Sequence, residues 1–358
     1  MKGVILMKKI LPFFIISLML VLASCYRDLI REEVFVVVEP PNLPAAAPKY
    51  EYPDEDYYYI EDYDKDYENY NYYDKDYDYY IEEAYEIFSI FIPDPRMIPQ
   101  IIEPCIIPPP TPTPAPRPRP AHLNNIDALS DAAGGWHFVR QPGGPPRGRE
   151  SAAVLRPFDA FFIGDTTVPR IFLTFDSGYE RGYTNTILDT LQEFNIHAAF
   201  FLTESYIRRN PAIVQRKINE GHVIANHSVT HRDFTELSDA EIERELVETA
   251  DRLYELTGHT MSPFFRPPAG RYSHRVLALI QSHGYYTVFW SFAHRDWVVA
   301  DQPPVETTIE RVVGSLHNGM VILLHTNSRS NTFALPYILE QALELGFEFA
   351  SLYELLQN

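Results

Sequence analysis

The sequence predicts an α/β fold in which strands and helices alternate around a parallel sheet. Two observations support this fold class. Six apolar runs rich in β-branched and aromatic residues each end on a polar or charged side chain, and they cover residues 171–176, 199–204, 222–227, 263–266, 287–291 and 321–325. Segments with helical spacing, including residues 239–257 and 332–345, lie between most of these runs. Because active groups gather at the carboxyl ends of parallel strands, five residues are candidates for one site: Asp176, His227, Arg266, Asp296 and His325.

The amino terminus is typical of an export signal. Lys8 and Lys9 precede an apolar run, residues 10–23, which is shorter than the roughly 20 residues that a membrane span needs. The following Leu22-Ala23-Ser24-Cys25 resembles a bacterial lipobox, in which the cysteine becomes the acylated first residue. We therefore predict a lipoprotein signal peptide over residues 1–24 and an exported, extracytoplasmic protein anchored in the membrane through Cys25, facing the cell wall. An ordinary cleaved signal and an uncleaved anchor are the alternatives.

Residues 25–121 have the composition of a disordered stalk. Residues 50–86 hold 14 of the 24 tyrosines, 15 acidic residues and two lysines, so this tract alone supplies −13 of the net charge of −19. It lacks aliphatic residues to bury, and like charges push it open. Residues 93–120 contain 12 prolines and are typical of a semi-rigid polyproline spacer. We expect a plain spacer, with contact between the tyrosines and sugar rings as the alternative.

Only the part of the chain from about residue 122 can build a core. It has no basic stripe that would face phosphates, so we expect no nucleic-acid partner. Cys25 and Cys105 are the two cysteines, and both precede this part. The catalytic part therefore has no disulfide framework and no cysteine metal site. Nothing in the sequence indicates an obligate protein partner.

Two segments of the catalytic part carry candidate chemistry. The first predicted strand ends in Thr174-Phe-Asp176-Ser-Gly178, where the glycine allows a tight turn before a helix that begins near Tyr183. The third leads into His227-Ser-Val-Thr-His231, whose imidazoles have the spacing that lets both face one metal ion on a helical turn. A zinc peptidase would need Glu directly after the first histidine, and Ser228 stands there instead. The pair alone leaves a structural role open.

Five ordered motifs over residues 170–355 give the chain a specific resemblance. They are the Asp176 and histidine motifs just described, Arg266-Pro-Pro-Ala-Gly270, Asp296-Trp297 and Leu323-Leu-His325. In this order they resemble the signatures of the polysaccharide deacetylase family, also called the NodB homology domain or carbohydrate esterase family 4. The resemblance implies a distorted (β/α) barrel of the NodB type over residues 170–358, with metal-assisted amide hydrolysis as its chemistry.

Further segments resemble one subgroup, the delta-lactam-biosynthetic de-N-acetylases that act on muramic acid in peptidoglycan. These segments are residues 174–184, residues 287–291, and His325-Thr-Asn-Ser-Arg329 with Asn331. Gly135-Trp-His-Phe138 also looks like that subgroup, which implies that residues 122–169 form an N-terminal extension packing on the barrel.

The resemblance implies roles for the residues of this chain that match the family motifs. It implies that His227 and His231 hold a divalent metal, with zinc as the first candidate. Asp176 would be the general base that takes the proton of the attacking water, and His325 the general acid that protonates the departing nitrogen. Arg266 would steady Asp176.

The resemblance also implies roles for residues around these five. Asp296 would orient His325 and keep it cationic. The backbone N–H of Ala269 would point at the developing oxyanion, and Trp297 would wall the pocket for the acetyl methyl group. Glu180 and Arg329 belong to subgroup motifs, and contact with the muramyl lactate and support of the loops are both open for them. Each of three residues also has a purely structural interpretation when taken singly. Arg266 would suit a surface ion pair, Asp296 a turn, and Trp297 a core position.

One position departs from the family pattern. The usual motif has two adjacent aspartates, the second of which is a metal ligand, and Ser177 stands at that second position. Members of the muramic subgroup similarly carry a non-acidic residue there, typically Asn. A hydroxyl is a poor neutral ligand, so we expect weaker metal binding and keep Ser177 as a further candidate ligand.

The predicted function is deacetylation of a peptidoglycan glycan strand, with N-acetylmuramic acid as the substrate and lactam formation as the consequence. Deacetylation of peptidoglycan N-acetylglucosamine, chitin or xylan is the alternative within the same chemistry. A non-catalytic wall-binding module is the alternative of another class, and Ser177 is the feature that favours it. Whether the protein serves spore cortex or vegetative wall stays open.

Overall fold

The computed structural model describes residues 121–141 and 144–357, so the predicted signal peptide, Cys25 and the stalk up to residue 120 lie outside the described residues. The described part confirms the predicted α/β class. Eight strands form one sheet in the order β11-β5-β6-β7-β8-β10-β4, and β12 pairs with β5. Every strand pair in this sheet is parallel. The strands are β4 (Ala160–Phe161), β5 (Arg170–Ser177), β6 (Ala199–Leu202), β7 (Val223–Asn226), β8 (Phe264–Phe265), β10 (Tyr286–Val288), β11 (Met320–His325) and β12 (Glu348–Phe349).

The sheet closes on itself irregularly. The chain beyond β10 reaches β11, where Ser291 and Phe292 both donate backbone hydrogen bonds to the carbonyl of Val321. Leu323 donates back to Phe292, and an isolated antiparallel bridge joins Ile163 to Met320. The contact that closes the sheet at β11 thus consists of isolated bridges rather than a full ladder. The fold is therefore the distorted (β/α) barrel that the resemblance implied.

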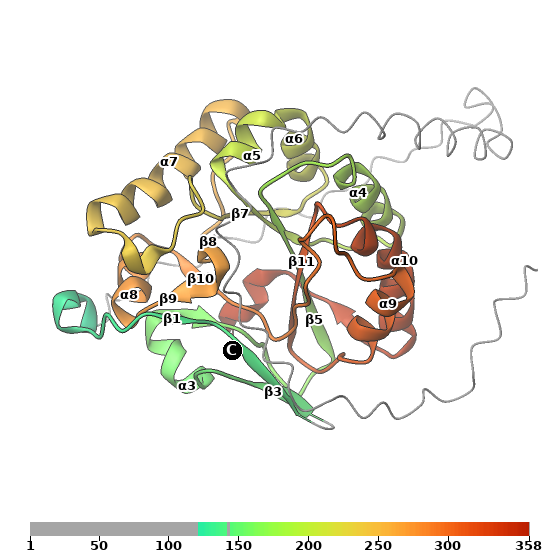
Figure 1. Ribbon diagram of the computed structural model, residues 1–358, viewed down its shortest axis with the longest axis horizontal. Helices are drawn as coiled ribbons and strands as arrows, with labels where there is room; N and C mark the ends of the chain where they lie inside the picture. Colours follow the sequence, from blue (N-terminus) through green and yellow to red (C-terminus); the bar gives the residue numbers. More distant parts are fainter. Residues whose placement is uncertain (1–120, 142–143, 358) are drawn as a thin grey trace, which may run out of the picture. The chain divides into compact units, whose positions relative to one another are not determined.

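In the described part of the chain, helices lie along the outside of the sheet (Figure 1). They are α4 (Thr184–Glu193), α5 (Glu204–Arg209), α6 (Pro211–Asn219), α7 (Asp239–Thr257), α8 (His274–Ser282), α9 (Val305–Val313) and α10 (Arg329–Glu344). Local sequence sets several of their ends. Ser238 and Glu241 form a capping box at the start of α7, and Gly258 ends that helix with φ 69°. Thr203, Ser273 and Ser328 each accept a backbone N–H at the start of the next helix.

Residues 121–141 and 144–169 pack against the barrel beside β10 and α8 (Figure 1). β1 (Gly134–Gly135) pairs with β9 (Arg271–Tyr272), and β2 (Phe138–Gln141) forms a hairpin with β3 (Gly144–Gly148). The short helix α3 (Ala152–Leu155) leads toward β4. Trp136 anchors this region because its indole N–H donates to the carbonyl of Trp290 at 2.9 Å and its ring stacks on Phe289.

Two layers of apolar side chains fill the fold. The outer layer lies between the sheet and its helices and includes Leu173, Phe175 and Phe200. The inner layer fills the barrel and includes Phe172 and Phe201. The C-terminal turn η7 (Leu352–Gln357) packs its leucines into this inner layer. Alternate residues of β5 therefore face opposite layers, as the two-residue period of a strand requires.

The structure differs from the sequence expectations in three places. β4 is a strand of the main sheet although it lies within the expected extension, and its two residues are too few to give a periodic signal. β10 ends at Val288, so the end of the expected run, residues 289–291, is not strand, because the chain turns there to reach β11. The histidine pair lies in an irregular loop rather than on a helical turn, because Ser228 and His231 both have positive φ.

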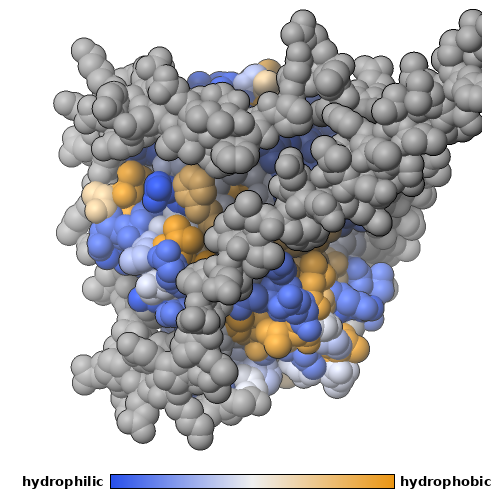
Figure 2. Space-filling model, turned by 90° about the vertical axis from the view of Figure 1, so that its right-hand side faces the viewer, coloured by the Kyte–Doolittle hydropathy of each residue, from blue (hydrophilic) through white to orange (hydrophobic). Residues whose placement is uncertain are grey.

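The surface of the described part carries both polar and apolar groups. Phe333 and Tyr337 of α10 are exposed, and hydrophobic and hydrophilic residues are interspersed where described residues are visible in Figure 2. Within residues 121–141 and 144–357, no helix is both long and apolar enough to cross a membrane.

Candidate active site

The strand ends bring the predicted base and acid side by side. In the parallel ladder between β5 and β11, His325 is paired directly with Asp176. The end of β7 pairs with β8, at Asn226 and Phe265, so His227 and Arg266 follow at the same edge. All four side chains are buried, with Asp176 6% and His325 8% exposed. The sheet therefore gathers residues that are up to 149 positions apart in the chain.

Asp176 is held by a fully buried arginine. Nη1 of Arg266 donates to Oδ1 of Asp176 at 2.6 Å, Nη2 donates to the hydroxyl of Thr174 at 2.9 Å, and Nε donates to the carbonyl of Val288 at 3.0 Å. The guanidinium also lies 4.1 Å from the centre of the Phe201 ring. Burial lowers the pKa of Arg266 and the Asp176 charge opposes this shift, but guanidinium keeps its proton in proteins. These contacts fix one carboxylate oxygen and leave Oδ2 of Asp176 for chemistry.

His227 and His231 form the second group of the site. The Nδ1–H of His227 donates to the carbonyl of Arg266 at 2.8 Å, which leaves Nε2 with its lone pair, 3.4 Å from Oδ2 of Asp176. The two imidazole rings lie 4.8 Å apart at 76°. Burial lowers the pKa of His227 and takes the pKa of His231 well below its ordinary value, so both rings are neutral at pH 7.

Glu245 of α7 holds the loop that carries these histidines. Its carboxylate accepts hydrogen bonds from the backbone N–H groups of Val229 and Thr230, both at 2.8 Å, and from the Thr230 hydroxyl at 2.6 Å. Ser228 and His231 have φ of 70° and 58°, which costs roughly 1–2 kcal/mol each for residues other than glycine. The buried carboxylate offsets this strain. The sequence reasoning missed Glu245, since nothing in its place on a helix points to a loop 15 residues earlier.

His325 and Asp296 form a buried pair on the other side of the site. Nδ1–H of His325 donates to Oδ1 of Asp296 at 2.7 Å, and the backbone N–H of His325 donates to Oδ2 at 2.9 Å. Burial by itself would lower the pKa of His325, but the Asp296 charge and hydrogen bond raise it above the ordinary value. Burial conversely favours a higher pKa for Asp296, and His325 holds that pKa below its usual range. Asp296 therefore fixes the orientation of the imidazole and favours its protonated form.

A short chain of polar groups supports this ion pair. The amide nitrogen of Asn331 donates to Oδ2 of Asp296. Nε2 of His294 lies 3.0 Å from the amide oxygen of the same asparagine, so the ring donates and fixes the amide orientation. The sequence placed Asn331 in a subgroup motif without a role, and it indicated no role for His294. Through their shared contact, Asn331 and His294 both help to hold Asp296, the partner of the predicted acid His325.

The remaining predicted residues take different positions. Trp297 packs on His325 with ring centres 5.5 Å apart, and with Trp136 and Trp290 it lines a recess of about 30 Å³. Ala269 lies in the turn after Arg266 with φ 50°. The next residue must be glycine, because a Cβ on Gly270 would lie 2.8 Å from the Trp290 ring.

Three predicted residues do not face this group. Ser177 lies on the opposite face of β5 from Asp176, where its Oγ accepts a hydrogen bond from the Thr326 hydroxyl at 3.0 Å. Glu180 accepts hydrogen bonds from the Gly182 N–H at 2.6 Å and from the hydroxyl of Tyr206 at 2.8 Å, so it supports the loop after β5. The guanidinium of Arg329 lies 5.0 Å from the centre of the Phe333 ring.

The donor chemistry of the site suits a divalent cation. Two neutral imidazoles with a carboxylate 3.4 Å from one of them are ligand types that zinc accepts. Among residues 121–141 and 144–357, no group of three or more His, Cys, Asp and Glu side chains is arranged to hold a metal. The protein donors present are thus fewer than a closed structural zinc site needs, and an open site with water is the arrangement that they fit.

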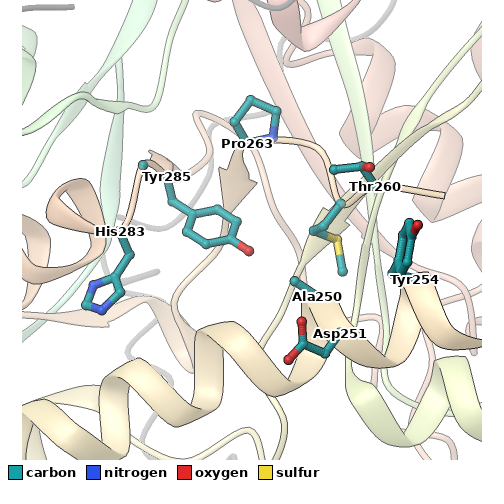
Figure 3. A pocket seen from close by; sticks show the side chains of 9 residues that line it. Ala250, Asp251, Tyr254, Thr260, Pro263, His283 and Tyr285 are labelled. Carbon is teal, nitrogen blue, oxygen red and sulfur yellow. The ribbon is translucent and has the colours of Figure 1, made fainter. Parts of the chain in front are cut away.

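A larger surface pocket lies apart from this group. It measures about 360 Å³ and is lined by residues of α7 and of the loops around Pro263 and Tyr285, as Figure 3 shows. Asp251 and His283 are its ionisable lining residues other than tyrosine, and neither belongs to a predicted motif. The catalytic candidates are therefore in the buried strand-end cluster and not in this pocket.

Comparisons with known proteins agree with the geometry. The family profile described as polysaccharide deacetylase matches residues 163–288. An uncharacterized 30.6 kDa protein of Geobacillus stearothermophilus is 40% identical over 227 residues, which cover 62% of this chain and 85% of that protein. The peptidoglycan-N-acetylmuramic acid deacetylase PdaA of Bacillus subtilis is 36% identical over 225 residues, covering 62% and 85%. The solved structure of B. subtilis PdaA, a family 4 carbohydrate esterase, matches with a TM-score of 0.62 and 34% identity over 64% of this chain and 99% of that one.

Proposed function

The chain belongs to the polysaccharide deacetylase family, carbohydrate esterase family 4, whose members hydrolyse amide C–N bonds, and from this premise we propose that it removes the acetyl group of N-acetylmuramic acid in peptidoglycan. The observation that carries the proposal is the pairing of Asp176 with His325 across adjacent strands, each held by its own buried partner, beside two neutral imidazoles. The similarity to a muramic acid deacetylase supports the choice of sugar. Loss of this acetyl group frees the amine that lactam closure requires.

His227 and His231 would hold a divalent cation, with Zn²⁺ as the best match for imidazole ligands. When bound, this cation supplies Lewis acidity, which lowers the pKa of water toward about 7 and polarises the acetyl carbonyl. Asp176 takes the proton of the attacking water through Oδ2, because Arg266 occupies Oδ1. The water oxygen forms the new bond to the acetyl carbon.

His325 delivers the second proton. Its Nδ1–H is bound to Asp296, so Nε2 is the nitrogen that can protonate the sugar amine as the C–N bond breaks. Arg266 and Asp296 thus give the two catalytic groups opposite partners, a cation for the base and an anion for the acid. The Ala269 N–H would bind the oxyanion, and Trp297 would exclude water beside the acetyl methyl group.

Asp176→Asn is the first test. The substitution keeps the hydrogen bond from Arg266 but removes the proton acceptor, so we expect acetate release from peptidoglycan to fall by about 10²–10⁴-fold with the fold intact. Acetate is measured with the full chain and added Zn²⁺, and circular dichroism checks the fold. A variant that retains the parent rate would remove Asp176 from the mechanism.

Muropeptide mass spectrometry tests the substrate. Digested peptidoglycan treated with the enzyme should lack one acetyl group on muramic acid, and a chelator should prevent the loss. Acetyl loss confined to glucosamine would replace the proposed substrate with the alternative sugar. Sugar binding without any acetyl loss would favour the wall-binding module.

We also propose that the protein works outside the cytoplasm, on a lipid anchor at Cys25, with residues 25–121 as a spacer and residues 122–169 as part of the folded unit. A wall substrate supports this placement. Metabolic labelling with a fatty acid should mark the parent chain and not Cys25→Ala. Equal labelling of both would refute the anchor.

A further inference from the structure

Lys217 is a buried lysine directly behind the catalytic strand β5. It lies on α6, and its side chain is 0% exposed. Its ammonium group donates to Oγ of Ser177 at 3.4 Å and to the hydroxyl of Tyr206 at 3.3 Å. The rings of Phe200 and Tyr206 enclose it, with their centres 4.3 and 4.4 Å from Nζ. None of the ion pairs found among residues 121–141 and 144–357 includes Lys217.

Keeping an ammonium in such a place is unfavourable for folding. Burial removes its hydration, and two neutral hydroxyls and two aromatic faces replace only part of it. Burial lowers the pKa of Lys217 to about 7, and Glu180 opposes this shift through its charge. A methionine of similar volume would avoid the cost. A polar role at this position would account for keeping lysine there.

The contacts of Lys217 lead to both catalytic strand ends. The ladder between β5 and β6 continues through Ser177, which is paired with Leu202, so Asp176 and Ser177 point to opposite faces. On the helix-facing side, Oγ of Ser177 accepts from Lys217 and from the Thr326 hydroxyl. Thr326 follows His325, and its backbone N–H donates to the carbonyl of Asp176 at 3.1 Å. Lys217 is thus two hydrogen bonds from the residue that follows the predicted acid.

We propose that Lys217 is a positioning residue for the deacetylase reaction: together with Thr326 it holds Ser177 in the helix-facing layer, so that Ser177 is no metal ligand and the ends of β5 and β11 stay in register. This inference rests on the proposed function. It assigns the metal to groups on the inner face of the sheet, His227 and His231, and gives the serine a structural bond in place of the ligand role of an aspartate. It also explains why a hydroxyl is suited to this position, since it can accept from both neighbours.

Zinc affinity separates a structural serine from a ligand. In isothermal titration of the detergent-solubilised full chain with zinc chloride, Ser177→Ala should keep the dissociation constant within about twofold. Ser177→Asp should also leave it within about threefold, because the new carboxylate faces Lys217 and pairs with it. Tightening of zinc binding by tenfold or more in Ser177→Asp would overturn the proposal, as would a tenfold weakening in Ser177→Ala.

A double-variant cycle tests the contact itself. Ser177→Asp should unfold at the parent temperature or above it, whereas Ser177→Asp with Lys217→Met should unfold at a clearly lower temperature, because a buried carboxylate then lacks its partner. Additive effects of the two substitutions would show that the residues do not interact, and would overturn the proposal.

Kinetics test the positioning role. Lys217→Met should lower kcat about tenfold and keep KM within about twofold, while its unfolding temperature stays equal to or above that of the parent. A merely structural lysine would lose stability and activity together, and unchanged kcat would equally overturn the role. Should the methionine variant not fold, Ser177→Ala provides the same test, since it removes the hydrogen-bond acceptor of Lys217 and should show the same fall in kcat.

His231→Ala is the matched control for the premise. It should lose zinc affinity by at least tenfold. If it binds zinc as the parent does, the metal site of the proposed function fails. If it loses zinc while Ser177→Asp gains affinity, the proposed function stands and the role of Lys217 fails.

Discussion

At the scale of single residues, the site gives two catalytic side chains different protonation behaviour through their nearest partners. Asp176 touches a buried guanidinium, and His325 touches a buried carboxylate. The imidazoles of His227 and His231 have pKa values lowered by burial, so each presents a lone pair rather than binding a further proton. Residue types alone would not separate these roles, because three of the four side chains, those of His227, His231 and His325, are imidazoles.

Asp296→Asn should move the alkaline limb of the activity profile. Asp296 raises the pKa of His325 against burial, so without its charge burial dominates and the pKa falls. The acid form of His325 is then lost at lower pH, and we expect kcat/KM to fall by about 10²–10⁴-fold at neutral pH, with its alkaline limb displaced to lower pH. A pH series of kcat/KM for both proteins gives the measurement. An alkaline limb that stays in place would assign the acid to another group.

The same pair has a defined effect on stability. Because the folded pKa of His325 is raised, its contribution is fully present below the unfolded value of about 6.5 and is lost as pH rises through the folded value. Asp296→Asn should therefore cost most stability below neutral pH. This direction is opposite to that of the buried neutral histidines.

At the scale of elements, the sequence predicted the strands that carry motifs and missed the contacts that hold the motifs in place. Asp176 and His325 could be predicted because each ends an apolar run. Lys217 could not, because its partner Ser177 is 40 positions away and α6 shows only an ordinary amphipathic pattern. β4 could not be recognised either, since two residues have no period and their pairing with β10 depends on residues 127 positions later.

The histidine loop shows why spacing is not conformation. Imidazoles four positions apart in the sequence fit a helical turn, yet Ser228 and His231 adopt left-handed conformations. The decisive residue is Glu245 on α7, whose carboxylate collects two backbone N–H groups of the loop. A contact between a helix and a preceding loop leaves no local pattern in the sequence.

Glu245→Ala should therefore release the histidine loop. The substitution removes the carboxylate that accepts hydrogen bonds from two partly buried N–H groups and a hydroxyl, at about 1 kcal/mol each, so we expect a loss of roughly 3 kcal/mol in the free energy of unfolding. Zinc affinity should fall with it, because the strained positions are no longer held. Glu245→Gln keeps one acceptor oxygen and should lose less of both. Urea unfolding and zinc titration measure the effects, and equal behaviour of the parent and Glu245→Ala would contradict the role.

At the scale of the whole molecule, buried neutral histidines make the fold sensitive to acid. Burial is the first cause of a lowered pKa at several sites in different parts of the barrel, which are His222, His227, His231, His294 and His317. Each of these rings stays neutral in the folded chain at a pH where the unfolded chain binds a proton. Stability is therefore fully present above the unfolded pKa of about 6.5 and declines as pH falls below it.

His222 gives this effect its clearest measurement. Burial, followed by the charges of His197, Lys217 and Arg216, lowers its pKa to about 3, and its Nδ1 accepts the backbone N–H of Ala198 at 3.2 Å. Between about pH 6 and pH 3 this ring alone should cost about 1.4 kcal/mol of unfolding free energy for each unit of acidification. His222→Asn offers an amide oxygen to Ala198 but binds no proton, so the slope of stability against pH should fall by about that amount. Urea unfolding of both proteins across this window measures the slope, and identical slopes would show that His222 is protonated in the folded chain.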